Sequence, residues 1–233
     1  RLRFIMDRYA TYSGSDPRKA PAVLSTIAFV EESFGAWHVK GGLGNLTTTV
    51  HKRAVDVGVT FHLNSPVASI QTTGNKATGV VLGDGTVVNA DAVIANADAS
   101  LVYNKLIIGH KRALKKARKN IANADVSVAG FSLLLGMRKD PEQVLNHHTI
   151  LFPENYDAEF DAIFKEGKPV EKPTIYICAP QDELMSKDEN LEGWFVLINA
   201  PTHGQFDWSN KEFSTKYANS IIDQIEARGI SVR

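Results

Sequence analysis

The sequence predicts an α/β protein in which helices and strands are interleaved along the chain. Three stretches carry this prediction. Residues 45–57 place apolar side chains at helical spacing, residues 59–64 alternate as a strand with one covered face, and residues 91–97 form a continuous apolar run. Because a helix, a half-buried strand and a fully buried strand follow one another, an α/β architecture is favoured over an all-helical or all-strand one.

The first part of the chain is predicted to be mainly helical. Residues 1–12 read as a helix, and residues 13–21, dense in Gly, Ser, Asp and Pro, read as a loop. Residues 22–35 are expected to form a helix that ends at Gly35. In the helix of residues 45–57, Gly58 takes the place of a C-terminal glycine cap.

Strands are predicted next. Residues 59–67 read as a strand with one covered face. Turn signals at 73–75 and 83–85 then separate three β-rich runs, which predicts a three-stranded antiparallel meander. The apolar run 91–97 is expected to be a strand buried on both faces.

The remaining chain alternates between both kinds of element. A basic helix is expected at 100–123, and its run of Lys, Arg and His at 110–119 reads as a solvated face. The other expected elements are strands at 126–136, 174–179 and 193–201 and helices at 155–166 and 210–229.

Composition excludes several classes of protein. Twenty-six basic residues balance 26 acidic ones, so no overall field attracts nucleic acid or an anionic membrane. A single cysteine, Cys178, excludes an internal disulfide and suits a reducing compartment. No apolar run approaches the length of a bilayer span. The chain starts and stops in helical patterns, which predicts that it is part of a longer protein.

The stretch Gly42-x-Gly44-x-x-Thr47 nearly matches the glycine loop that wraps the pyrophosphate of a dinucleotide. However, the segment before it is short and polar, Thr47 replaces the third glycine, and Asn64 stands where an acidic ribose ligand is expected. We therefore expect a turn that needs glycine for positive φ. A nicotinamide dehydrogenase using Gly42 and Gly44 is the weaker alternative.

No metal site is expected. His147 and His148 are adjacent, so on a strand their rings would point to opposite faces. The other histidines lack the spacing of known ligand motifs. Cys178 lies in an apolar strand, where a buried, inert thiol is the usual case.

Several segments, taken in order, resemble the carotenoid desaturase family, the phytoene-desaturase-type flavoproteins of the amine-oxidase-like superfamily. The segment with Tyr-x-Gly-Ser-x-Pro followed by Ala-Pro is the most specific of them. The matching segments are residues 8–22, 30–46, 58–70, 77–98, 147–164 and 173–180.

The resemblance implies FAD as cofactor and a two-domain flavoprotein of which this chain is an internal part. It assigns residues 1–40 to helices of the substrate domain, 41–99 to part of a Rossmann-like FAD domain that includes the meander, and 100–233 to a substrate domain with a mixed sheet. Its implied cofactor contacts are Val67, Asn96, Ala97, Asp98, Gly41 and Gly42.

The implied reaction is dehydrogenation of an apolar polyene such as phytoene. A carotene offers no polar handle, so the substrate must bind through apolar contacts. Candidate substrate residues are Phe29, Phe34, Trp37 and Leu43, for which core packing is the alternative. The family also implies a cytoplasmic enzyme in peripheral contact with the membrane. The alternatives are a carotenoid oxygenase or isomerase of the same family, or a non-catalytic polyene- or lipid-binding module.

Overall fold

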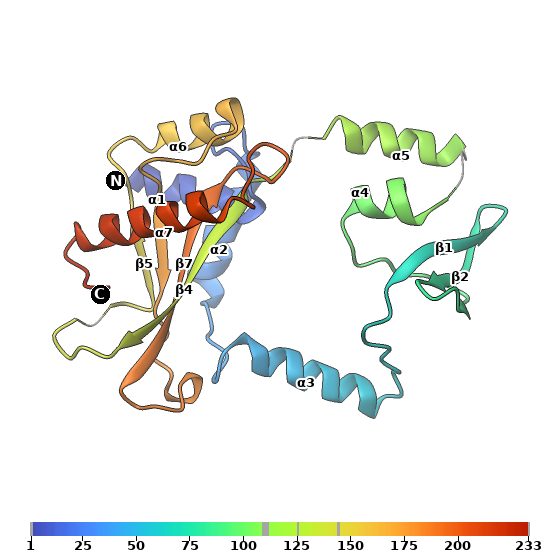
Figure 1. The fold of residues 1–233 in the computed structure, drawn as a ribbon, viewed down its shortest axis with the longest axis horizontal. Helices are drawn as coiled ribbons and strands as arrows, with labels where there is room; N and C mark the ends of the chain where they lie inside the picture. The colour runs from blue at the N-terminus through green and yellow to red at the C-terminus, as the bar shows by residue number, and fades with distance from the viewer. Residues whose placement is uncertain (1, 109–111, 125, 144, 233) are drawn as a thin grey trace. The chain divides into compact units, whose positions relative to one another are not determined.

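A computed structural model describes residues 2–108, 112–124, 126–143 and 145–232 (Figure 1). The chain divides into two compact units. The larger unit joins Arg1–Lys52 to Ser127–Arg233, and the smaller unit is Arg53–Val126, inserted between these two segments. Helices accompany two separate antiparallel sheets, one in each unit.

The N-terminal helices follow the predicted pattern. They are α1 (Leu2–Arg8), α2 (Ser25–Phe34) and α3 (Leu43–Asp56), with 3₁₀ turns at Tyr9–Ser13 and Ala22–Leu24. Gly35 ends α2 with a φ of 80°. Gly58 ends α3 with a φ of 91°, and the Val59 N–H reaches the Ala54 carbonyl while the Gly58 N–H reaches that of Val55. This is the Schellman arrangement, so the predicted glycine cap is confirmed.

The larger unit contains a four-stranded sheet in the order β4-β7-β6-β5. All its pairings are antiparallel, so the described residues form no parallel part of the expected mixed sheet. Its strands are β4 (Ala129–Arg138), β5 (His148–Leu151), β6 (Ile175–Cys178) and β7 (Leu191–Ala200). Strands β4, β6 and β7 match the predictions, whereas β5 was not predicted because only four residues of it pair.

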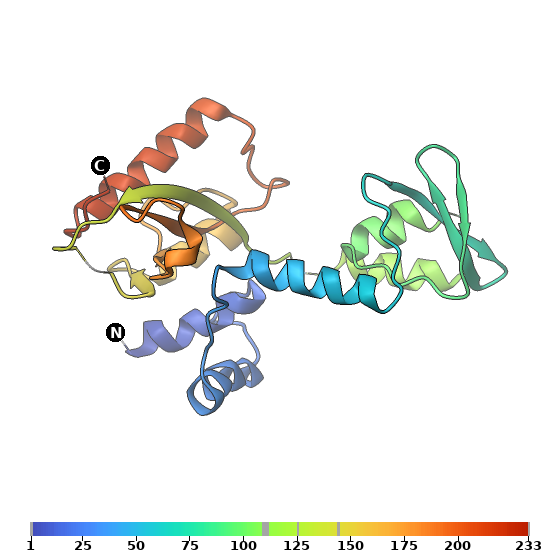
Figure 2. The same ribbon diagram turned by 90° about the horizontal axis from the view of Figure 1, so that it is seen from below.

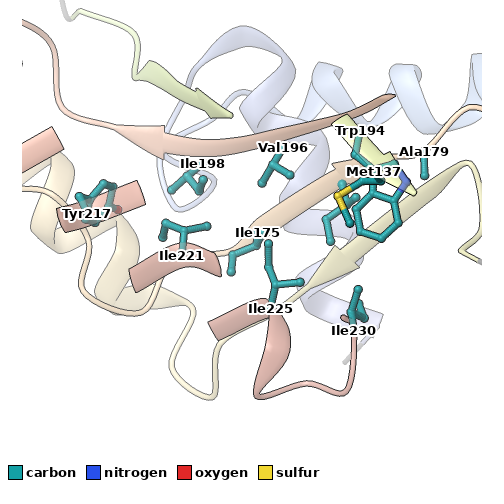
Figure 3. Packing of buried hydrophobic residues seen from close by; sticks show 11 residues of the cluster. Met137, Ile175, Ala179, Trp194, Val196, Ile198, Tyr217, Ile221, Ile225 and Ile230 are labelled. Carbon is teal, nitrogen blue, oxygen red and sulfur yellow. The ribbon is translucent and has the colours of Figure 1, made fainter. Parts of the chain in front are cut away.

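Helix α7 (Lys211–Glu226) covers one face of this sheet (Figure 2). Because side chains alternate along a strand, Trp194, Val196 and Ile198 of β7 all point to this face, where each is almost completely buried. Ile221 and Ile225, four residues apart on α7, meet them (Figure 3). The Asn210 side chain caps the helix by accepting the Phe213 N–H at 3.1 Å.

Helix α6 (Asp157–Asp161), extended by a π turn at Ala162–Glu166, carries a buried carboxylate. Glu159 is 0% exposed. Its two oxygens accept the Thr174 N–H at 2.6 Å and the Asn199 side-chain N–H at 2.8 Å. Burial raises the pKa of Glu159, and these two hydrogen bonds offset only part of that effect. One side chain therefore joins α6 to the sheet.

The smaller unit contains the predicted meander. Strands β1 (Val67–Thr73), β2 (Lys76–Leu82) and β3 (Val87–Asn89) pair in sequence order and antiparallel. Helices α4 (Ala99–Leu101), continued by a π turn at Val102–Leu106, and α5 (Arg112–Ala122) follow. The basic run 110–119 lies partly outside the described residues, but the Arg118 guanidinium donates to the Tyr103 and Ile107 carbonyls. Arg118 therefore departs from the predicted solvated face, because its guanidinium binds two backbone carbonyls.

Two strand predictions are wrong. Residues 59–66 belong to no strand: Leu63 and Asn64 form a turn, in which Asn64 has a φ of 55°, and pairing starts only at Val67. The run 91–97 likewise forms no strand, and Ile94 within it is 94% exposed. A strand is defined by its pairing with another strand, and neither segment belongs to either of the two sheets formed by the described residues. Among these residues we also find no helix with both the length and the apolarity to cross a membrane.

Candidate functional site

The glycine turn before α3 confirms the predicted need for positive φ. Gly41 and Gly42 have φ values of 78° and 85°, a backbone conformation that side-chain-bearing residues rarely adopt. Gly42 is also buried, and a β-carbon added there would lie 3.4 Å from the Met185 terminal carbon. Gly44, in contrast, lies in α3, and an added β-carbon would have no atom within 4 Å.

Asp182 holds this turn from 141 residues away in sequence. Its Oδ2 accepts the Gly41 N–H at 2.5 Å and is 2.8 Å from His38 Nε2, while Oδ1 accepts the Leu184 N–H at 3.0 Å. The His38 contact, followed by the backbone donors of Gly41 and Leu184, lowers the pKa of Asp182 to about 2. Asp182 is therefore ionised at neutral pH. The sequence did not indicate Asp182 as part of the site, because no pattern near residue 182 points to His38 and Gly41 as its partners.

The same hydrogen bonds argue against a phosphate-binding loop at this turn. A pyrophosphate loop presents free backbone N–H groups to the ligand. Here the Gly41 N–H is donated to a carboxylate, and the Gly42 N–H is donated to the Val39 carbonyl at 2.8 Å. An ionised aspartate beside the turn would also repel a phosphate. The nicotinamide alternative that uses Gly42 and Gly44 is therefore contradicted.

The predicted substrate residues lie on the surface. Phe29 and Phe34 project from α2, Leu43 starts α3, and Trp37, between them, is 89% exposed. All four are exposed, so none of them packs in the core formed by the described residues. Scattered apolar residues are normal on a protein surface, but here four large exposed ones fall within 15 residues of the sequence.

The sheet face opposite α7 carries several exposed apolar side chains. Helices α1 and α2 lie on this side of the sheet (Figure 2), and α6 covers its end at Asn199, which is 5% exposed. Leu134 of β4 is 81% exposed and Phe195 of β7 is 37% exposed. The strand register places the side chains of this open face in two rows. They are Leu134, Phe195, Cys178 and His148 in one row, and Ser132, Leu197, Tyr176 and Ile150 in the other.

Three histidines lie together at one end of this open face. The ring centroids of His38 and His147 are 5.0 Å apart, and those of His147 and His148 are 4.4 Å apart. The predicted opposition of His147 and His148 is wrong because only His148 belongs to β5. Burial, followed by the charges of His148 and His38, lowers the pKa of His147.

Cys178 is half-buried, so the expected fully buried thiol is also wrong. It lies directly across from His148 in the register of β5 and β6. Its side chain therefore shares the open face with the histidine rings instead of lying in the core under α7.

The predicted cofactor residues of the smaller unit are exposed. Val67 starts β1, while Asn96 and Ala97 are exposed and outside any strand, and Ala97 lies in a bend. The Asp98 carboxylate is already engaged, because it caps α4 by accepting the Ser100 N–H at 2.8 Å. The Asp98 side chain therefore serves the helix.

Comparison with known proteins places these features in a family. Residues 4–144 match the family model described as flavin containing amine oxidoreductase. The chain is 34% identical over 231 residues to 1-hydroxycarotenoid 3,4-desaturase of Flavobacterium sp. (strain P99-3), covering 97% of this chain and 45% of that protein. It is 35% identical over 210 residues to the zeta-carotene-forming phytoene desaturase of Myxococcus xanthus, covering 89% of this chain and 40% of that protein.

A relative of another activity is also similar. The 4,4'-diapolycopene oxygenase of Methylomonas sp is 32% identical over 176 residues, covering 76% of this chain and 34% of that protein. The chain thus spans less than half the length of each of these three relatives.

Proposed function

Because the chain belongs to the flavin-containing amine oxidoreductase family, we propose that it supplies the substrate face and part of the flavin site of an FAD-dependent enzyme that dehydrogenates a carotenoid-type polyene. Two of the three relatives described above are named as carotenoid desaturases, which supports a polyene as substrate. Within the family, residues 41–99 are proposed to belong to the flavin domain and residues 1–40 and 100–233 to the substrate domain.

The observation that carries this proposal is the open apolar face of the β4-β7-β6-β5 sheet. Leu134, Phe195 and Leu197 are neighbours across β4 and β7, and Tyr176 and Ile150 continue the surface across β6 and β5. A polyene has no polar group that could orient it, so an extended apolar surface must bind it. Such contact stabilises the complex by about 25 cal/mol per Å² of apolar area removed from water.

The reaction needs an electron acceptor that side chains cannot supply. When bound, the flavin provides the acceptor for the two electrons that leave the polyene on dehydrogenation. Backbone at Val67, Asn96 and Ala97 is proposed to contact the cofactor. The glycine turn at Gly41 and Gly42, whose N–H groups are already donated, is proposed to lie near the flavin ring or the polyene instead of the pyrophosphate. The chain's own contribution to the chemistry is to hold the polyene on an apolar surface and to exclude water from it.

The open face can be tested by placing one charge on it. Leu134→Asp puts a carboxylate in the middle of the proposed contact, and we expect polyene affinity to fall about 10–100-fold, since 1.4 kcal/mol is tenfold. Quenching of tryptophan fluorescence by a carotene in detergent micelles measures the affinity of the purified chain. Leu184→Asp is the matched control, because Leu184 is 64% exposed but lies outside the sheet. Equal affinities for the two variants would contradict the proposed face.

The reaction itself is tested with the whole protein that carries this chain, in a host that accumulates phytoene. The proposed activity predicts pigments with longer conjugation and red-shifted absorbance, and less of them with Leu134→Asp than with Leu184→Asp. Polyene binding without any such product would instead favour the non-catalytic binding module. An oxygenated product would favour the activity named for the Methylomonas relative.

Peripheral membrane contact is proposed for the four exposed residues Phe29, Phe34, Trp37 and Leu43. Exposed aromatic residues of this kind are typical of surfaces that enter a lipid interface. Trp37→Ala is expected to reduce binding to phosphatidylcholine vesicles about tenfold or more, because burying one large side chain contributes about 1.5–3 kcal/mol. Co-sedimentation measures this, with Leu184→Ala as control. If Trp37→Ala sedimented with vesicles as well as the unmodified chain does, the proposed membrane contact at these residues would be contradicted.

A further inference from the structure

A cluster of metal-binding residue types lies at one end of the open sheet face. The candidate ligand atoms of His147, His148 and Cys178 all lie within 4.8 Å of one another. Two of these residues are fixed by strand pairing, because His148 of β5 is the register partner of Cys178 of β6. The third is fixed beside them, since the His147 carbonyl accepts the Ala179 N–H at 3.0 Å. Backbone structure therefore brings all three together before any ligand is present.

We propose that His147, His148 and Cys178 bind one zinc ion. Two imidazoles and a thiolate are ligands that zinc prefers, whereas calcium and magnesium require oxygen ligands. With metal bonds of about 2.0–2.3 Å, tetrahedral ligand atoms lie about 3.3–3.8 Å apart. The three side chains need to converge by only about 1 Å, which side-chain rotation provides. A fourth position remains for water.

Neighbouring side chains orient the ligands. The Tyr176 hydroxyl lies 2.7 Å from His148 Nδ1, and the two rings stack. While Nδ1 keeps this hydrogen bond, Nε2 is the atom available to the metal. His38, paired with Asp182, packs edge-on against His147 and so limits the positions of that ring. Partners of this kind hold the imidazoles of zinc sites in place. The site depends on neither the flavin nor the polyene.

The thiol offers a direct test because Cys178 is the only cysteine of the chain. The half-buried thiol of the metal-free chain should react with a thiol reagent, and this reactivity should be lost when zinc is added. His147→Asn should abolish the protection. His203→Asn, which changes an exposed histidine outside the cluster, should retain it. Equal reactivity of the unmodified chain with and without zinc would overturn the proposal.

Cobalt supplies a spectroscopic readout. One equivalent of Co²⁺ per chain should produce a thiolate-to-cobalt charge-transfer band, and zinc should displace it. Cys178→Ser should lose the band while circular dichroism shows the fold retained. Tyr176→Phe should keep the band but weaken cobalt binding about 10-fold, as for other residues that orient a ligand. No band in the unmodified chain, or the same band in Cys178→Ser, would overturn the proposal.

Discussion

Glu159→Ala is expected to lower the free energy of unfolding by about 3–5 kcal/mol, because it leaves buried donors without an acceptor. In the native structure the Thr174 N–H and the Asn199 side chain both donate to this carboxylate, which is completely buried. Removing it exposes neither donor to water and also leaves a cavity. Urea unfolding of the purified chain measures the loss.

The matched control for this change is Glu166→Ala. Glu166 lies in the π turn that follows α6, but its side chain is exposed and its contact with Lys168 is 3.5 Å long. We expect a change within about 0.5 kcal/mol for such a surface position. A Glu159→Ala variant as stable as Glu166→Ala would show that the buried carboxylate does not join α6 to the sheet.

The raised pKa of Glu159 also determines whether the stability of the fold rises or falls with pH. Above pH 4.5 the unfolded chain loses this proton, while the folded chain keeps it until its own, higher pKa is reached. The folded state binds more protons in this window, so its stability falls as pH rises through the window. Glu159→Gln has no proton to lose. Its stability deficit relative to the native chain should therefore be largest near pH 4.5 and narrow toward neutrality, and parallel pH profiles would contradict this reading.

Gly79→Ala is expected to separate β2 from β3. Gly79 pairs with both Gln71 and Asn89, at the centre of the meander. An added β-carbon would lie 2.3 Å from the Val88 carbonyl oxygen and 3.0 Å from the Asn89 α-carbon. Both obstacles are backbone atoms of the partner strand, so no side chain can rotate to make room. We expect a loss of about 3 kcal/mol or more in the stability of the smaller unit.

Amide hydrogen exchange measures this loss locally, as faster exchange across residues 76–89. Gly85→Ala is the control. Gly85 has a φ of 88°, but an added β-carbon would have no atom within 4 Å. Only the backbone strain of about 1–2 kcal/mol is then expected. Equal exchange in the two variants would show that the close approach of Val88 does not limit residue 79.

The features predicted correctly from the sequence were those set by a few neighbouring residues. Gly35, Gly58 and the turn at Gly41 and Gly42 were recognised because a positive φ is a property of one or two residues. The predictions of strands at 59–67 and 91–97 were wrong because an apolar pattern indicates a preference for pairing but does not show whether a partner strand is in reach. Pairing is a property of two segments, and only the three-dimensional structure shows both.

The sequence-based prediction of the site was incomplete for the same reason. Asp182 reaches the glycine turn from 141 residues away, so nothing near Gly41 marks it. The pair His147 and His148 was judged by the alternation of a strand, although the strand begins at the second of them. The register of β5 against β6 then places Cys178 beside His148, which no spacing along the chain indicates. Family resemblance supplied the identity that these local signals lacked.

The insertion of one compact unit into the other sets the order in which these two units can be completed during synthesis. The larger unit joins Arg1–Lys52 to Ser127–Arg233, and the Gly14 carbonyl accepts the Val128 N–H at 3.0 Å. At about 5–20 residues per second, the ribosome needs roughly 4–15 s to make the intervening segment. During that interval the first helices have no sheet to join, while the inserted meander can already fold. Nascent chains stalled in this interval would present those helices to chaperones.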